Sequence, residues 1–509
     1  MAKAYILAHD LGTSGDKASI YDEEGNLAGS CTYTYETAYP KTGWAEQDAR
    51  DWWNAVAKSS KALLEKLNIN PSKIACVSFS GQMMGCLPVD EKGRALRRSI
   101  IWADQRAVAE TEFVRAAFGG DRMYEVTGTS VAPNYSLEKI LWLKNNERDT
   151  YDKACKFLNA KDYIVYRLTG NFATDCSDAS GTNLFDIKKK VWSHDIVKAT
   201  GVDASKLPDV YVSTDVVGGV TAEAAQETGL MPGTPVVIGG GDGPCATVGA
   251  GAVEEGDIYN YFGSSSWISV TTSKPLYDPN QATFNLCHLD PEFYMAPGTM
   301  QSAGGSYEWM REVLSDIGKV AKGEALTLDF EALNAEAMKS VPGAHALLFL
   351  PYLMGERCPY WNPDARGAFI GLTRGHTLAD IIRAVFEGPI FNLRVIIDLF
   401  QAQGIRSSEI RLIGGAVKSD FICRLMADIY EMDVLRPYVL EEATSFGAAV
   451  AGGVGVGMYK GFHVVKDMIR IKDRIKPEES NCAKYRALYP AFKNAYTQLI
   501  DIFKVLAGQ

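Results

Sequence analysis

Paired cysteines are missing from this sequence. Its ten cysteines are scattered, with no CxxC pair and no Cys/His cluster. This distribution argues against a zinc site and a disulfide framework, and it fits a reducing cytosol. Long apolar runs are also missing, since the run near the N-terminus is too short for a signal-peptide core or a membrane span. We therefore expect a cytoplasmic protein with no membrane partner.

Positive charge is scarce. The 52 Lys and Arg residues are outnumbered by 62 Asp and Glu residues, which gives a formal net charge of -10. A nucleic-acid partner therefore has no electrostatic support. No GxGxxG motif follows the first predicted strand, which argues against a Rossmann-type dehydrogenase. The 509 residues are too many for one hydrophobic core, so we expect several domains.

One stretch carries a candidate catalytic carboxylate. Residues 236–238 are a β-branched run that predicts a buried strand, and three glycines then lead to Asp242. Pro244 fits the first turn of a following helix. Ligands of open α/β sheets bind at the carboxyl ends of strands, so Asp242 is a functional candidate. The glycines would let a ligand approach the backbone closely, and they also allow turn dihedrals that other residues resist. The structural alternative is therefore a capping aspartate in a glycine-rich turn.

Two predicted hairpins have similar tips. The first follows a strand that ends at Asp10, and the second lies within residues 256–270. Backbone N–H groups and hydroxyls at such tips can bind phosphate oxygens, and Lys17 would add a point charge. Ordinary glycine-containing turns are the alternative. The tips contain Gly12, Thr13, Ser14, Gly263 and Ser264.

The repeated hairpin indicates a distant internal duplication. We expect two similar α/β domains, at residues 1–250 and 251–509, with a cleft between them. Within the second domain, residues 410–420 predict a strand, a glycine turn and a helix start. A glycine pair there would let a flat base or a phosphate lie against the backbone, although a structural turn would look the same.

A candidate sugar site lies in the first domain. Trp102, Asp104 and Arg106 are spaced two apart, so on an extended segment they would face the same side. An indole offers an apolar face for a sugar ring, and the charged groups can bind hydroxyls. A surface ion pair beside a packed tryptophan is the alternative.

In this order, the chain resembles the FGGY family of carbohydrate kinases over nearly its whole length. Each motif is weak or moderate alone, but their common order is specific. The motifs are Asp10-x-Gly-Thr-Ser-x-x-Lys17, residues 43–48, Trp102-x-Asp104-x-Arg106, Gly240-Gly-Asp242, residues 367–372 with 380–387, Gly414-Gly-Ala416 with Ser419, and residues 442–449. The resemblance implies two actin-like, ribonuclease-H-like (ASKHA) domains with ATP between them.

The resemblance also implies roles. It implies transfer of the γ-phosphoryl group of ATP to a sugar hydroxyl, with Mg²⁺ as the metal. Asp242 would accept the proton of the attacking hydroxyl, and Asp10 would help to place the metal. The nucleotide would be held by Gly12, Thr13, Ser14, Lys17, Gly263, Ser264, Gly414, Gly415, Ala416 and Ser419. Family analogy further suggests a homodimer.

Within the family, the segment from Gly81 to Gly85 decides the sugar. Glycerol kinases carry an Arg-Glu pair where Met83 and Met84 stand, so glycerol is disfavoured. Xylulokinases are closer but usually have Met-His there, and a thioether lacks the hydrogen-bonding power of an imidazole. The predicted acceptor contacts are Gln82, Met83, Met84, Trp102, Asp104, Asn134 and Asp242.

A pentulose kinase, with D-xylulose as the leading acceptor, is therefore our interpretation. A ribulose, a hexulose, a sugar acid or a tetritol stays open, because loss of a polar contact can change specificity by orders of magnitude. A hypothesis from another class is a non-catalytic actin-like module that binds ATP. The retention of Asp242 together with Trp102 and Asp104 disfavours that module, which needs no phosphoryl acceptor.

Overall fold

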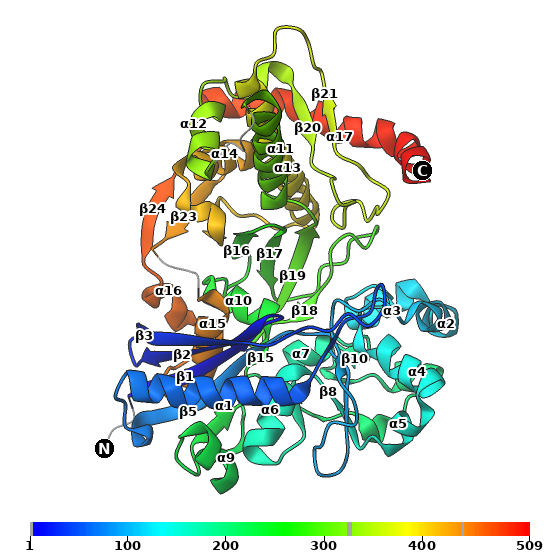
Figure 1. Cartoon of the computed structure of the whole chain (residues 1–509), viewed down its shortest axis with the longest axis vertical. Helices are drawn as coiled ribbons and strands as arrows, with labels where there is room; N and C mark the ends of the chain where they lie inside the picture. Colours follow the sequence, from blue (N-terminus) through cyan, green and yellow to red (C-terminus); the bar gives the residue numbers. More distant parts are fainter. Residues whose placement is uncertain (1–3, 323–327, 439–441, 509) are drawn as a thin grey trace.

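The computed structural model describes residues 4–322, 328–438 and 442–508. Figure 1 shows two α/β halves, the first half of the chain below and most of the second half above. Each half is built on a seven-stranded sheet. Within the described residues, no helix has the length and apolar character needed to cross a membrane.

The first sheet combines an antiparallel hairpin edge with parallel strands. Its order is β3 (Leu27–Thr34), β2 (Gly15–Asp22), β1 (Tyr5–Leu11), β5 (Ile74–Gly81), β14 (Pro235–Val237) and β13 (Val216–Gly219), and β15 (Gly240–Gly241) also pairs with β5. Strand β1 is antiparallel to β2 and parallel to β5. One core packs α1 (Ala49–Lys66), α6 (Ala160–Thr169) and α9 (Ala222–Thr228) on this sheet. Asp48 begins α1 by accepting from the N–H of Arg50.

The second sheet repeats the first. Its order is β18 (Leu286–Cys287), β19 (Tyr294–Met300), β17 (Ser266–Thr272), β16 (Ile258–Phe262), β22 (Glu409–Ile413), β23 (Asp433–Pro437) and β24 (Ile471–Ile475). From β3 to β13, and from β19 to β24, the neighbouring strands pair in the same succession of directions: antiparallel, antiparallel, parallel, parallel, antiparallel. The predicted internal duplication and the two-domain α/β fold are confirmed.

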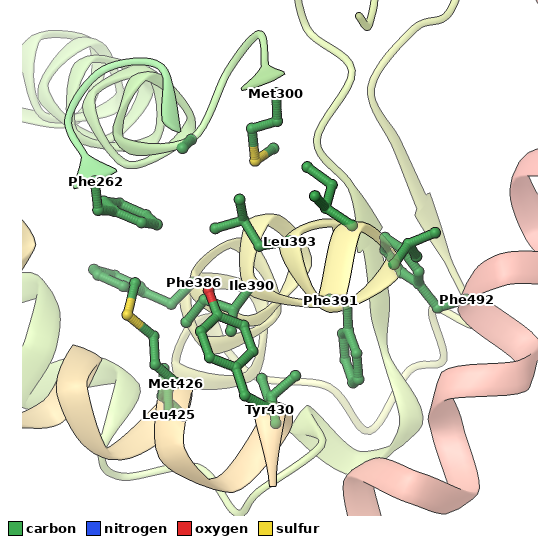
Figure 2. Packing of buried hydrophobic residues seen from close by; sticks show 14 of the residues in the cluster. Phe262, Met300, Phe386, Ile390, Phe391, Leu393, Leu425, Met426, Tyr430 and Phe492 are labelled. Atoms are coloured by element: carbon green, nitrogen blue, oxygen red, sulfur yellow. The ribbon is translucent and has the colours of Figure 1, made fainter. Parts of the chain in front are cut away.

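Helices pack against strands of the second sheet to form the core of the upper half. The helices are α11 (Gly304–Lys322), α12 (Phe330–Ala337), α13 (Leu378–Ala402), α14 (Asp420–Tyr430) and α17 (Glu479–Ala507). Helix α13 carries apolar residues on nearly all of its faces, as is typical of a helix that is buried on most sides. Figure 2 shows Phe386, Ile390 and Leu393 of this helix amid side chains from the strands β16 and β19 and from the helices α14 and α17. Burying each such side chain contributes about 1.5–3 kcal/mol, so α13 anchors this half.

A helical insertion completes the lower half. Between β7 (Ser99–Ile100) and β13 it contains α2 (Val108–Phe118), α3 (Gly120–Thr127), α4 (Ser136–Asn146), α5 (Arg148–Lys153), α7 (Cys176–Ser180) and α8 (His194–Thr200), besides α6. Many of its apolar side chains form a separate core. The insertion also includes the short strands β8 (Lys156–Leu158) and β9 (Ala173–Asp175).

Helix α15 (Ala443–Gly455) links the two halves. It comes from the second half of the sequence but packs on β1 and β5 of the first sheet. It also crosses α10 (Asp242–Gly249) with the backbones in contact, since a Cβ on Gly249 would lie 1.8 Å from the carbonyl oxygen of Ala443. The domain boundary near residue 250 stays a prediction. After it, the chain returns to the first sheet through α15.

Candidate active site

Asp10 lies near the carboxyl end of β1, the central antiparallel–parallel junction of the first sheet. Its Oδ1 accepts from Ser80 Oγ at 2.9 Å, and its Oδ2 accepts from Thr444 Oγ1 at 2.5 Å. Burial raises the pKa of Asp10, and the nearby charge of Asp16 adds to the effect. Because each carboxylate oxygen can accept more than one bond, capacity for a metal or a water remains.

Asp242 is the first residue of α10 and follows β15 directly. The predicted strand-to-helix turn is thus confirmed. The N–H of Gly243 donates to Asp242 Oδ1 at 2.8 Å. Burial, with a smaller contribution from the charge of Asp10, raises the pKa of Asp242 to about 7. A carboxylate with a pKa near neutrality is suited to general-base catalysis at physiological pH.

The three glycines before Asp242 are required by packing against the protein itself. A Cβ on Gly239 would lie 2.0 Å from the carbonyl oxygen of Phe79. A Cβ on Gly240 would lie 2.3 Å from a methyl carbon of Leu289. Gly239 also has a left-handed φ of 67°, which favours glycine. These glycines therefore fit the strand end between its neighbours.

The first hairpin tip is connected to the predicted sugar residues. The N–H of Gly12 donates to the carbonyl oxygens of Asp10 and Gly15. Trp102 Nε1 donates to Thr13 Oγ1 at 2.9 Å. Ser14, predicted in the same tip, is exposed. The tip is therefore accessible, while part of its backbone capacity is already used within the hairpin.

Lys17 is predicted to add a point charge at the first tip. Its Nζ pairs with Glu442, at the start of α15, at 3.2 Å. The side chain of Lys17 is about one-third exposed, so this ion pair contributes little stability on its own. A contact between Lys17 and phosphate stays a prediction, and it would have to compete with Glu442.

The second tip lies beside the predicted adenosine turn. The N–H groups of Gly304 and Gly305, at the start of α11, donate to the carbonyl oxygens of Gly263 and Ser264. Gly414 has a φ of 93°, and a Cβ there would lie 2.6 Å from the carbonyl oxygen of Phe262. The tip and the glycine turn are thus adjacent at the end of β16.

The turn itself divides into exposed and structural parts. A Cβ on Gly415 would meet no atom within 4 Å, so this position borders open space. Gly415 and Ala416 lie in the 3₁₀-helix η4 (Gly415–Lys418). Ser419 caps α14: its Oγ accepts from the N–H of Ile422 and from Asn334 Nδ2. The geometry therefore favours Gly415, more than Ser419, as a position beside a ligand.

The segment with Trp102, Asp104 and Arg106 is not extended, and the expectation that the three side chains face one side is wrong. The chain turns at Trp102, whose side chain is 42% exposed, whereas Asp104 is completely buried. Asp104 pairs with Arg106 through both carboxylate oxygens, and the Arg106 guanidinium lies 3.6 Å from the ring centre of Trp44. Asp104 and Arg106 form a buried ion pair, not the surface pair of the structural alternative, and they fix the loop that presents Trp102. A sugar contact of Asp104 stays a prediction.

The Gln82–Met84 segment is partly core. Gln82 Nε2 donates to Gln47 Oε1 at 2.8 Å, while its buried Oε1 has no partner within the described part of the chain. Met83 is buried in a small cluster with Leu286 and Met295. The Met84 side chain is partly buried against this cluster, and Met84 has a left-handed φ of 61°. Met83 therefore belongs to the core. Gln82 has a side-chain oxygen without a partner in the described part of the chain, and Met84 has a left-handed backbone.

A cavity of about 490 Å³ lies between the halves, and the predicted interdomain cleft is confirmed. Trp102 and Asn134 line it from the lower half. From the upper half it receives Gln301, Glu356 and Arg357. The latter two belong to the long loop between β20 (Leu348–Leu350) and β21 (Ala368–Ile370), which descends toward the lower half in Figure 1.

Sequence reasoning missed Glu356 and Arg357, as well as Thr444 and Lys139. The only sequence indication for the first two is an adjacent pair of opposite charges in a loop rich in proline and aromatic residues. Thr444 lies within the family motif at residues 442–449, but its bond to Asp10, like the bond of Lys139 to Met84, joins residues far apart in the sequence, so no local pattern shows these contacts.

The acidic residues are compatible with Mg²⁺. Within the described residues no group of three or more His, Cys, Asp or Glu side chains could hold a metal by itself. Asp10 and Asp242 are close enough for their charges to interact. Mg²⁺ is typically held by one or two carboxylates together with substrate phosphates and waters, so Asp10 fits it.

Comparisons with known proteins decide the family. Residues 5–249 match the N-terminal domain of the FGGY family of carbohydrate kinases, and residues 258–456 match its C-terminal domain. The chain belongs to the FGGY family of carbohydrate kinases. It is therefore an enzyme that phosphorylates a sugar, and the family-level prediction is confirmed.

Individual relatives agree over the full length. The chain is 32% identical to the xylulose kinase of Staphylococcus xylosus over 97% of this chain and 100% of the relative. It is 31% identical to the gluconokinase of Bacillus subtilis (strain 168) over 98% of both. The crystal structure of ligand-bound xylulose kinase from Lactobacillus acidophilus superposes with a TM-score of 0.91, 27% identity and 99% coverage of both chains. These matches confirm the actin-like two-domain fold of this FGGY chain.

Proposed function

We propose that this FGGY kinase transfers the γ-phosphoryl group of ATP to a hydroxyl of a pentulose, with D-xylulose as the leading acceptor. The observation that carries the proposal is the position of Asp242, the first residue of α10, directly after a strand that ends beside Asp10. The similarity to xylulose kinases supports the choice of sugar. The departure at Met84 is the reason to test other acceptors.

The mechanism assigns the chemical step to Asp242. In its ionised form, Asp242 accepts the proton of the acceptor hydroxyl while that oxygen attacks the γ-phosphorus, and the bond from the γ-phosphorus to the bridging oxygen breaks so that ADP leaves. Trp102 offers an exposed indole for the sugar ring, and Asn134 offers an amide on the same cavity. The hairpin tips bind phosphate oxygens, and Gly415 leaves space for the base. Bound through Asp10, Mg²⁺ would neutralise phosphate charge.

A sugar acid is the second candidate. Arg357 is half-buried in the cavity lining, and within the described residues its guanidinium forms no ion pair or side-chain hydrogen bond. A guanidinium can bind a carboxylate through two parallel hydrogen bonds. This feature, together with the similarity to gluconokinases, favours an aldonate over other non-pentulose acceptors.

One experiment tests both candidates. Purified enzyme is supplied with MgATP and a panel of ketoses, polyols and sugar acids, and ADP release is coupled to a spectroscopic readout. D-xylulose with the highest kcat/KM supports the pentulose proposal. An aldonate with the highest value supports the second candidate. ADP release that no sugar increases would overturn both.

Location and assembly complete the proposal. The scattered cysteines fit the cytoplasm, where thiols stay reduced. A homodimer is our expectation for the assembly. Cell fractionation and light scattering of the purified chain test these two points.

A further inference from the structure

Lys139 is a buried cation bound to three backbone carbonyls. It lies in the first turn of α4 and is fully buried. Its Nζ donates to the carbonyl oxygens of Met84 at 2.7 Å, Ile101 at 2.8 Å and Asn134 at 2.6 Å. Three acceptors require three N–H groups, which only the protonated amine supplies.

The three carbonyls belong to three separate segments of the acceptor site. Met84 and Asn134 are predicted acceptor contacts, and Ile101 directly precedes Trp102. Trp102 and Asn134 line the cavity between the halves. Lys139 does not line this cavity, so any effect of Lys139 on acceptor binding must come from the segments that it holds in place.

One of these segments has a costly backbone. Met84 is a non-glycine residue with a left-handed φ, a conformation that persists only where the surroundings hold it. Lys139 binds its carbonyl oxygen, and Ser136 Oγ donates to the next carbonyl, that of Gly85, at 2.7 Å. The first turn of α4 thus fixes the Met84–Gly85 bend from two positions.

The charge of Lys139 is itself unusual. Within the described residues no carboxylate forms an ion pair with it, and the titratable or charged groups that face it are Cys86, Asp104, Glu138 and Arg106. Burial lowers the pKa of Lys139 to about 7. A well-packed apolar side chain of similar size often replaces a buried charge without loss of stability. The presence of an amine at this position is therefore explained by the three carbonyls that it holds in place, more than by a gain in stability.

We propose that Lys139 is a positioning residue that holds the Met84, Trp102 and Asn134 segments at fixed separations and thereby shapes the sugar site. The inference rests on the proposed kinase function. It assigns Lys139 no contact with ATP and no role in proton transfer.

The first test replaces the amine by an apolar isostere. Lys139→Met should lower kcat/KM for the preferred acceptor by about 10²-fold, the effect of a misplacement near 1 Å. The KM for ATP should stay at the wild-type value. Lys139→Gln retains two N–H donors on a shorter side chain. Its kcat/KM for the acceptor should lie between the values of the wild type and of Lys139→Met. A loss that is equal for sugar and ATP would overturn the proposal.

Lys156→Met is the matched control. Lys156 also donates to backbone carbonyls, those of Ser205 and Leu207, at 2.8 and 2.7 Å, but these carbonyls belong to no acceptor segment. Its sugar kcat/KM should equal that of the wild type. An equal loss in both variants would show a general effect of removing a lysine.

One measurement does not depend on the variant activity. Hydrogen exchange of Lys139→Met should become faster at residues 83–86, 101–104 and 132–136 and nowhere else. Unchanged exchange there would refute the positioning role. Wild-type enzyme that phosphorylates no acceptor would instead refute the proposed function, and the exchange result would still stand.

Discussion

Asp10 and Asp242 lie on opposite sides of Ser80 at one edge of the first sheet. Asp10 is paired with Ser80 in the β1–β5 ladder, and Gly240, two residues before Asp242, is paired with Ser80 from the other side. Two parallel pairings to the same strand bring both carboxylates to the carboxyl ends of their strands. The charge of Asp10 makes ionisation of Asp242 harder and so contributes to the raised pKa of Asp242.

Asp242→Ala should lower kcat by about 10²–10⁴-fold, because the general base is lost. ATP affinity should change little, since we expect the carboxylate to face the acceptor hydroxyl. Steady-state kinetics with the preferred sugar, together with calorimetric ATP binding, measure both quantities. A folded variant with nearly normal turnover would exclude Asp242 as the base.

Asp242→Asn should make the protein more stable at neutral pH. The folded-state pKa of Asp242 is raised from 3.8 to about 7, so its favourable contribution is fully present below pH 3.8 and is lost as pH rises through 7. The asparagine variant has no charge to bury. Its melting temperature should therefore equal that of the wild type near pH 4 and exceed it at pH 8.

Asp48→Asn supplies the control of opposite sign. Hydrogen bonds from the Arg50 side chain hold the pKa of Asp48 below its usual range, so its contribution is present above pH 3.8 and is lost at lower pH. This variant should gain no stability between pH 4 and 8. A gain of the same size in both variants would mean that the rise reflects net charge, not the environment of Asp242.

Gly415→Val should raise the KM for ATP far more than that for sugar. A Cβ at this position enters open space, so the added side chain clashes with a bound base, not with the protein. Gly461→Val is a suitable control, because a Cβ there also meets no atom within 4 Å. An unchanged ATP KM in Gly415→Val would place the nucleotide elsewhere. A rise in Gly461→Val would show that the effect is not local.

The elements that sequence patterns predicted correctly are those governed by local chemistry. The strand-to-helix turn at Asp242 and the glycine turn at Gly414 depend on a few adjacent residues. The repeated hairpins could be recognised because both halves use a glycine between two strands. Such features are fixed by backbone sterics, which a sequence states directly.

The features that sequence patterns missed depend on distant partners. The ion pair of Asp104 with Arg106 could be foreseen from their spacing, but the bond that its Oδ2 accepts from the distant N–H of Ala45 could not. Lys139 was not singled out by any sequence pattern, yet three carbonyls from three segments surround its amine. Spacing along the chain cannot show whether such a side chain is bound by groups of the protein or is free to contact solvent or a ligand.

Met84 is the residue by which the acceptor preference should be most readily changed. Its left-handed φ of 61° is compatible with histidine, which is enriched in that region among non-glycine residues. Its sulfur lies 3.4 Å from Asn134 Nδ2, so the side chain is near a residue of the cavity lining. An imidazole here would place a polar ring where the thioether offers almost no hydrogen bonding.

Met84→His should therefore shift the preference toward D-xylulose. A new hydrogen bond contributes about 0.5–1.5 kcal/mol, which corresponds to a gain of roughly threefold to tenfold in kcat/KM. The ATP KM should not change, because the phosphate tips and the Gly415 turn belong to other segments. The sugar panel and a melting curve separate this from a packing role: contact with the sugar changes the ranking at constant melting temperature. A lower melting temperature with an unchanged ranking would show that Met84 only packs against Met83, and specificity would then have to come from Trp102 and Asn134.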